Sequence, residues 1–286
     1  MITDEIASKH LGKKSELTKS YNPSLLVAVP REENRQIYKI DSFNLPFVGF
    51  DVWHCYEFSA LTKYGLPFTK PIKLKYNCNS EYIVESKSLK LYLNSFNMTR
   101  FELSTEDSLA VCKSLIEKDL FKKLKTDVHI NFIDDNVSKR NIFDNYTELT
   151  NMVDVNSINI EEFNENPNLL TYLNEAINEY RLKFSSLRSN CRVTHQPDFG
   201  DIDETSLIKY LVSFRSEYHF HEECVEMIYK RLSDILNTDD ELAVCALYTR
   251  RGGIDISPLR VSRNCKINDF DYLSDINTFS RYGVKQ

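Results

Sequence analysis

The chain has 286 residues, of which 42% are hydrophobic and 27% are charged, and its formal net charge is −6 at pH 7. This length suits one large domain or two ordinary ones, and the composition is typical of a globular protein with a buried core. The acidic balance argues against a stable complex with nucleic acid, which needs a basic face, and no apolar run approaches the length that spans a membrane. We therefore expect neither nucleic acid nor a membrane as a partner.

The seven cysteines are odd in number, are scattered, and include no CxxC pair. That pattern favours reduced thiols in the cytoplasm over a disulfide framework or a zinc site. The first residues include Asp4, Glu5 and Lys9 and no apolar segment, so we expect no signal peptide and a cytoplasmic location. His219 and His221 form an HxH pair, but without further ligands at a known spacing we predict no bound metal.

Nucleotide-binding motifs rich in glycine do not occur in this sequence. There are seven glycines, and no two of them form a GxG motif. The dinucleotide fingerprint of Rossmann domains and the phosphate-binding Walker loop are therefore both missing. If the protein uses a nucleotide cofactor, it must bind the cofactor in another way.

In the first half of the chain, segment 71–78 (PIKLKYNC) alternates apolar and polar residues, which predicts a half-buried antiparallel strand. Apolar residues at helical spacing over 109–120 predict an amphipathic helix. Segment 128–133 (VHINFI) has the apolar pattern of a strand. The same order of a helix and then a strand returns in the second half, over 225–235 and 242–249.

An internal echo precedes each of these helices. Residues 88–96 read SLKLYLNSF and residues 206–214 read SLIKYLVSF, with six of nine positions identical. Chance similarity between two buried helices would explain the nine residues alone, but the shared order of the elements that follow favours a duplication.

We therefore predict two related α+β units, an N-terminal domain over residues 1–150 and a C-terminal domain over residues 165–286. Segment 144–168 is rich in Asn, Asp, Glu and Thr, as expected of a surface connection. Within the second unit, segment 249–256 (TRRGGIDI) predicts a β-hairpin that turns at its two glycines.

Segment 189–200 (SNCRVTHQPDFG) places a cysteine, a histidine and an aspartate close together. The polar neighbours of Cys191 suit a thiolate nucleophile, whereas Cys112 and Cys245 lie in apolar patterns. Any single cysteine is more often a small buried hydrophobe, so both interpretations of Cys191 stay open. Asp198 stands between a proline and an aromatic residue, and is either a general acid with a raised pKa or a turn-forming aspartate.

Two glutamates and a basic cluster are further candidates. Glu85 follows a predicted strand, and Glu222 begins a predicted helix, where acidic residues are favoured by the helix dipole alone. A carboxylate at either place can accept two parallel hydrogen bonds from a guanine-like edge. Lys87, Arg250, Arg251 and Gly252 suit a phosphate group, and a solvated basic hairpin is the alternative.

Together these segments resemble the NADPH-dependent 7-cyano-7-deazaguanine reductases, the nitrile reductases of queuosine biosynthesis, in their longer two-module form. The resemblance is carried by VESKSLKLYLNSF (84–96), SNCRVTHQPDFG (189–200), FHEECVE (220–226) and YTRRGGIDISP (248–258). It implies two tandem tunnelling-fold (T-fold) modules, each an antiparallel sheet with helices packed on one face, and assembly into a homodimer. The N-terminal module would carry the ESKS motif and the C-terminal module the cysteine and the aspartate.

The resemblance also implies residue roles. Cys191 would attack the nitrile carbon of 7-cyano-7-deazaguanine (preQ0) to give a covalent thioimide, and Asp198 would donate a proton to the nitrogen. Two NADPH molecules would then reduce the adduct to the aminomethyl product (preQ1), with His221 assisting proton movement. The implied substrate contacts are Val84, Glu85, Ser86, Phe220, His221 and Glu222. The implied NADPH contacts are Ser86, Lys87, Arg251 and Gly252.

Two other functions fit the same residues. A cysteine-dependent hydrolase or amidotransferase would use Cys191 with His195 and let water complete the reaction. A non-catalytic purine-binding protein of the same fold would have no need of an intact Cys191 and Asp198. Oxidation of NADPH without release of ammonia separates the reductase from the hydrolase.

Overall fold

The computed structural model describes most of the chain. The described residues are 20–133, 139–140, 145–154, 158–171, 181–191, 197–200, 205–265, 270–277 and 279–280. Helices and largely antiparallel strands alternate along them, so the predicted α+β class is confirmed. No helix among these residues is long and apolar enough to cross a membrane.

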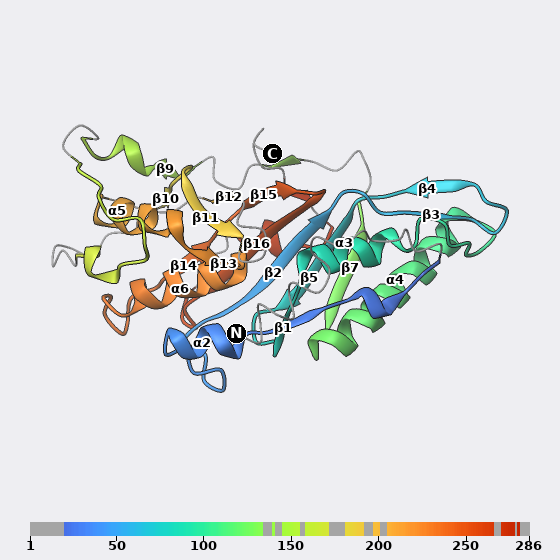
Figure 1. Ribbon diagram of the computed structural model, residues 1–286, viewed down its shortest axis with the longest axis horizontal. Coiled ribbons are helices and arrows are strands. Elements are labelled where there is room, and N and C mark those ends of the chain that lie inside the picture. The colour runs from blue at the N-terminus through green and yellow to red at the C-terminus, as the bar shows by residue number, and fades with distance from the viewer. Residues whose placement is uncertain are drawn as a thin grey trace.

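Along the first half of the chain, strands come before and after two consecutive long helices (Figure 1). Its elements are β1 (Ala28–Pro30), α2 (Glu32–Ile37), β2 (Val48–Cys55), β3 (Ser59–Leu61), β4 (Pro67–Thr69), β5 (Ile72–Asn77), β6 (Tyr82–Val84), α3 (Ser86–Asn94), α4 (Thr105–Leu124), β7 (Val128–Phe132) and β8 (Lys139–Arg140). Helix α4 begins where the Ser104 hydroxyl accepts a hydrogen bond from Asp107 N at 3.0 Å, and it ends at Lys125 in the left-handed conformation.

The second half repeats the order of strands, two helices and strands. Its elements are β9 (Thr147–Glu148), β10 (Leu182–Lys183), β11 (Leu187–Cys191), β12 (Pro197–Gly200), α5 (Thr205–Ser213), β13 (Tyr218–His219), α6 (His221–Ser233), β14 (Ala243–Cys245), β15 (Tyr248–Arg251), β16 (Ile254–Val261), α7 (Asp271–Ser274) and β17 (Phe279–Ser280). Both copies of the echo are nine-residue helices, α3 and α5, and each is followed by a longer helix and then a strand, as predicted.

One antiparallel sheet contains strands from both halves (Figure 1). Its order is β14-β16-β2-β5-β7, and β15 also pairs with β16. Strands β2 and β16 join the halves, with paired residues from Val48↔Val261 to Cys55↔Ile254. Their backbones lie very close at one position, because a Cβ atom on Gly49 would stand 2.0 Å from the carbonyl oxygen of Leu259.

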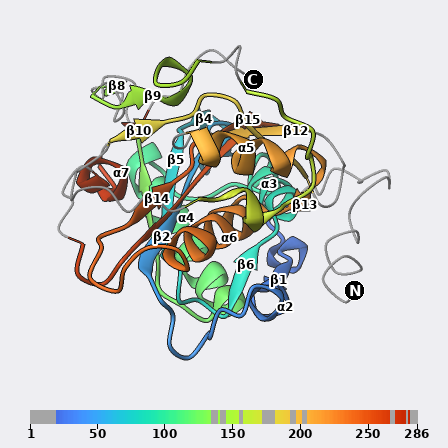
Figure 2. The same ribbon diagram turned by 90° about the vertical axis from the view of Figure 1, so that its left-hand side faces the viewer.

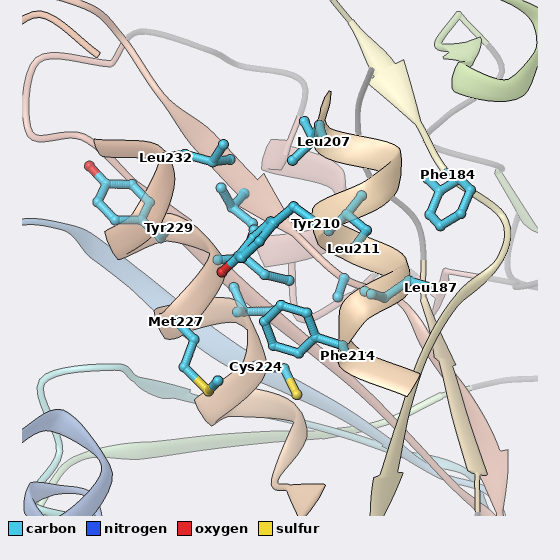
Figure 3. Close-up of a cluster of buried hydrophobic side chains, with 14 of the residues drawn as sticks. Phe184, Leu187, Leu207, Tyr210, Leu211, Phe214, Cys224, Met227, Tyr229 and Leu232 are labelled. Atoms are coloured by element: carbon cyan, nitrogen blue, oxygen red, sulfur yellow. The ribbon is translucent and has the colours of Figure 1, made fainter. Parts of the chain in front are cut away.

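Helices α3, α4 and α6 pack on one face of this sheet. The side chains of α3 and α4 form a core with Trp53 and Leu74, while α5 and α6 form a second core in which their side chains meet between the two helices (Figure 3). On the opposite face, Leu273 of α7 packs near Val52 of β2, and Figure 2 shows α6 and α7 on opposite sides of the strands. The sheet is therefore covered on both faces.

Strand β5 is antiparallel with a buried apolar face, as predicted, but its polar face is more buried than expected, since Lys73 is buried and Lys75 is only partly exposed. Lys73 and Lys75, on the face away from α3, are covered by the segment that contains α7. Lys73 Nζ donates to the carbonyl of Asp275 at 2.6 Å, and Lys75 Nζ donates to that of Ser274 at 2.9 Å. The alternating pattern identified the two faces and gave no sign that a distant segment covers the polar one.

The strand predicted over 242–249 is divided into β14 and β15. Both pair with β16, and the break at Ala246 lies opposite Pro258. A proline has no N–H to donate, so the ladder lacks one hydrogen bond there. The predicted hairpin is confirmed, since Arg251 pairs with Ile254 across a turn of two glycines with positive φ.

A network of buried charges connects the halves through α2, β2, α6 and β16. Glu226 of α6 accepts hydrogen bonds from Arg35 at 2.8 Å and from Arg260 at 3.0 Å, and Arg31 lies 3.4 Å away. Asp51 of β2 accepts from Arg31 at 2.5 Å and from Arg260 at 2.9 Å. Burial by itself would raise the pKa of Glu226, but the three guanidinium groups lower it to about 2.

We expect Glu226→Gln to destabilise the protein at pH 7 by about 3–5 kcal/mol, because it leaves buried guanidinium groups without their shared anion. A carboxylate with a lowered pKa stabilises the fold above its unfolded value of 4.5, and this contribution disappears as the pH falls toward 2. Urea unfolding at pH 7 and pH 3.5 measures both effects. The exposed Glu106→Gln is the control, and a variant as stable as that control at pH 7 contradicts the assignment.

Candidate active site

The N-terminus of α6 carries three of the predicted site residues. Phe220 is the N-cap residue, and its backbone N–H donates to Glu223 Oε2 at 3.0 Å, which fixes where the helix begins. His221 and Glu222 are the first two helical residues, so the predicted position of Glu222 at a helix start is confirmed. The His221 ring stacks on Tyr248 of β15, with 3.9 Å between centroids and 9° between planes.

Glu222 is a buried acid whose Oε1 atom has no hydrogen-bond partner among the described residues. Burial raises its pKa to about 8, the nearby Asp51 carboxylate adds to this, and Arg31 and Arg260 oppose it. A buried oxygen without a partner costs free energy, which a ligand that donates a hydrogen bond would recover.

The N-terminus of α3 carries the residues predicted from the ESKS segment. Val84 ends β6, and Glu85 is the N-cap of α3, where its carboxylate accepts hydrogen bonds from Lys87 N at 3.1 Å and Ser88 N at 2.7 Å. Glu85 is thus engaged with its own helix, and its predicted contact with a substrate stays a prediction. Ser86 is the first helical residue.

Near this helix lie groups suited to an anion. The Lys87 Nζ atom is buried and has no hydrogen-bond partner among the described residues. One turn further along α3, Lys90 Nζ donates to the carbonyl of Gly252 at 2.6 Å, and it also lies 3.1 Å from Glu57. Lys90 therefore anchors the β15–β16 turn against α3. Arg251 ends β15, and its side chain lies outside the described residues.

Strand β11 ends at Cys191 and pairs with two other strands. Ser189 lies opposite Asp198 of β12, and Cys191 lies beside His219 of β13. Since residues alternate between faces along a strand, positions 189, 191 and 198 share one face. On that face the buried Ser189 hydroxyl accepts from Cys224 Sγ of α6 at 3.5 Å. The side chains of Cys191 and Asp198 lie outside the described residues, as does all of His195, so their roles stay predictions.

His219 fixes β13 against α6. Its Nε2 atom is 3.2 Å from Glu217 Oε2, and its Nδ1 atom is 3.7 Å from Glu223 Oε2. Burial would lower the pKa of His219, but the two carboxylates raise it above its usual value. In the described part of the chain, no cluster of His, Cys, Asp and Glu is suited to hold a metal ion.

Two further cysteines lie where the sequence pattern placed them. Cys112 and Cys245 are buried, in agreement with the apolar patterns around them. Burial raises the pKa of the Cys112 thiol to about 12, and it also raises that of Cys245. Neither thiol ionises near neutral pH, so neither is a nucleophile.

Sequence reasoning missed Tyr76, which lies near Glu222. The Tyr76 hydroxyl, on the helix-facing side of β5, is buried and has no hydrogen-bond partner among the described residues. Burial raises the pKa of Tyr76, and the charges of Glu222 and Asp51 add to the shift. In the alternating pattern of β5 this tyrosine is one more apolar position, so only the tertiary structure reveals its polar neighbours.

Comparison with known proteins defines the class first. Residues 17–132 match the family described as "Nitrile reductase, 7-cyano-7-deazaguanine-reductase N-term", and residues 189–266 match the family described as "QueF-like protein". The chain is 38% identical over 272 residues to the NADPH-dependent 7-cyano-7-deazaguanine reductase of Colwellia psychrerythraea strain 34H, which covers 90% of this chain and 93% of the relative. It is 39% identical over 262 residues to the protein of the same name from Coxiella burnetii strain CbuK_Q154, covering 87% and 90%. The chain belongs to the 7-cyano-7-deazaguanine reductase family.

We expect the buried Glu222 to make the protein less stable at alkaline pH. An acid whose pKa rises from 4.5 to about 8 on folding stabilises the fold fully below pH 4.5, and this contribution is lost as the pH rises through 8. Glu222→Gln should therefore be more stable than the wild type at pH 8.5 by roughly 3–5 kcal/mol, with little difference at pH 5. Urea unfolding at both pH values measures this, again beside Glu106→Gln. A pH-independent difference would show that Glu222 is ionised in the native state.

Proposed function

We propose that this protein reduces the nitrile group of 7-cyano-7-deazaguanine to the aminomethyl group of 7-aminomethyl-7-deazaguanine, with NADPH as the hydride donor. The observation that carries the proposal is the identity of 38–39% across both halves to proteins named NADPH-dependent 7-cyano-7-deazaguanine reductase. The relatives are matched over 90% or more of their own length, so the similarity is not confined to one module.

The site has the polar groups that a deazaguanine requires. A guanine-like edge presents a ring N–H and an exocyclic amine side by side, and a carboxylate accepts both. Glu222 has a buried oxygen that is available for this purpose, and the buried Phe220 precedes it. Val84, Glu85 and Ser86 complete the proposed substrate contacts.

Cys191 is the proposed nucleophile. Its thiolate adds to the nitrile carbon, and Asp198 supplies the proton that the nitrogen takes up, which gives a thioimide with a reducible C=N bond. Two hydride transfers, each matched by one proton, then convert this carbon to CH₂–NH₂ and return the thiol. His221, held against Tyr248, is the proposed proton carrier for the later steps. The shared face of positions 189, 191 and 198 supports this assignment.

The residues near α3 fit NADPH, which supplies the hydride when bound. Lys87 provides a buried ammonium group without a partner among the described residues. The turn at Gly252 is held to α3 by Lys90, and its positive φ suits close approach of the backbone to a phosphate. Ser86 and Arg251 are the remaining proposed contacts. These groups bind and orient the cofactor, and the exclusion of water from the site protects the thioimide from hydrolysis.

The finer architecture belongs to the same proposal. The antiparallel sheet with α3, α4 and α6 on one face, together with the repeated order of elements, supports two T-fold modules over residues 1–150 and 165–286. The homodimer, the cytoplasmic location and the absence of nucleic acid or membrane as direct partners rest on the family resemblance and the composition.

Cys191→Ala should abolish both NADPH oxidation and the covalent adduct. Intact-protein mass spectrometry of the wild type with the nitrile alone should show one added substrate mass, and peptide mapping should place it on the peptide that contains residue 191. The buried Cys112→Ala is the matched control and should keep the adduct. Unchanged turnover in Cys191→Ala would exclude the thioimide mechanism, and ammonia release without NADPH oxidation would support the hydrolase or amidotransferase alternative.

Glu222→Ala should weaken binding of the deazapurine by about 10- to 100-fold, because a charged acceptor of two hydrogen bonds contributes about 1.5–3 kcal/mol. Binding of NADPH should change by less than about 3-fold. Calorimetric titration with each ligand separates the two effects. Equal losses for both ligands would count against the assignment of Glu222 to the substrate.

A further inference from the structure

Two acids on the same face of α6 have opposite environments. Glu222 and Glu226 are four residues apart, so they are neighbours on the helix surface. Glu226 is saturated with hydrogen bonds from Arg35 and Arg260, whereas Glu222 Oε1 has no partner in the described part of the chain. Arg31 and Arg260 are close enough to lower the pKa of Glu222, yet their hydrogen bonds go to other acceptors.

The reason is that Asp51 and Glu226 occupy the donors of the nearby arginines. Arg31 donates to Asp51 at 2.5 Å, to Glu226 at 3.4 Å and to Ser80 at 3.1 Å. Arg260 donates to Asp51 at 2.9 Å, and its other donors go to Glu226 and to backbone carbonyls. The hydrogen bonds of both guanidinium groups thus go to acceptors other than Glu222.

The charged and titratable groups around Glu222 come from four elements. Asp51 of β2 raises its pKa, Arg31 before α2 and Arg260 of β16 lower it, and burial is larger than any of these effects. Tyr76 of β5 adds a buried hydroxyl whose own pKa is raised by burial and also by the charges of Glu222 and Asp51. The outcome of this balance is a carboxyl group whose pKa of about 8 favours the protonated form at neutral pH.

We propose that Asp51 is a positioning residue of the site, which keeps Arg31 and Arg260 away from Glu222 so that Glu222 holds a proton until a ligand with paired N–H donors displaces it. This inference rests on the proposed function. On binding, the neutral carboxyl group of Glu222 loses its proton to the buffer and becomes a carboxylate that accepts hydrogen bonds from the ligand. No electron is transferred, and no bond other than O–H breaks.

The arrangement also selects between ligands. An edge with two donors gains a full anion as its acceptor once the proton has left. An edge that presents one acceptor next to one donor, as adenine does, would pair with the neutral carboxyl and release no proton. Proton release therefore marks a guanine-like ligand at Glu222 and is a readout that does not depend on catalysis.

Calorimetric titration with 7-deazaguanine, which has no nitrile to react, tests the proposal. Repeating the titration in buffers of different ionisation enthalpy gives the number of protons released per ligand. With the pKa of Glu222 at about 8, we expect about 0.9 proton at pH 7, about half a proton at pH 8 and almost none at pH 9.5. Binding without proton release at pH 7 would overturn this inference and leave the proposed function intact, whereas no binding at all would overturn both.

Two variants with opposite expected effects test the network. Asp51→Asn removes the neighbouring anion, so the pKa of Glu222 should fall by about one unit or more. Fewer protons per ligand should then be released at pH 7. Arg31→Gln removes a cation, so the pKa of Glu222 should rise and the affinity for 7-deazaguanine at pH 7 should fall. One folded variant of the two is sufficient for the test.

The controls follow from the same chain. Asp119→Asn replaces a buried aspartate of α4 that accepts from Tyr92 at 2.8 Å, and it should keep the wild-type profile. Glu222→Gln should release no proton. A proton still released by Glu222→Gln, or a profile unchanged in both network variants, would contradict the assignment.

Discussion

The buried pairing of Arg31, Arg35 and Arg260 with Asp51 and Glu226 is the interaction on which the rest of the structure depends. Five charges removed from water are tolerable only because each carboxylate is shared by two or more guanidinium groups at hydrogen-bonding distance. The network fixes α6 against β2 and β16 and brings α2 to the same point. It therefore decides where the first turn of α6, with its site residues, stands relative to the sheet.

The sheet and the charge network together bring parts of both halves of the chain to the candidate site. Strand β16 of the second half lies between β14 and β2, so the β15–β16 turn reaches α3 of the first half, where Lys90 holds it. In the same way the α6 terminus stands over strands of both halves. Among the described residues, the candidate site thus draws on both halves: α3 comes from the first, and the α6 terminus and the β15–β16 turn come from the second.

Local patterns predicted the elements well, because helical and strand periodicities are properties of neighbouring residues. Such patterns predicted helices α3 and α5, the start of α6 near Glu222, and the hairpin at Gly252. What could not be predicted depends on distant partners: the cover over Lys73, the break opposite Pro258, and the charge network. The role of Cys191 came from the family resemblance, since one cysteine in a polar segment leaves its chemistry open.

Gly49 limits which substitutions the contact between β2 and β16 tolerates. At this position the backbones of β2 and β16 are closer than any side chain allows, since an added carbon would overlap the Leu259 carbonyl. A replacement there is tolerated only if the opposite strand moves at the same time, which single substitutions rarely achieve. The junction between the two halves is therefore intolerant of substitution at this one point, where the spacing of β2 and β16 depends on the absence of a side chain.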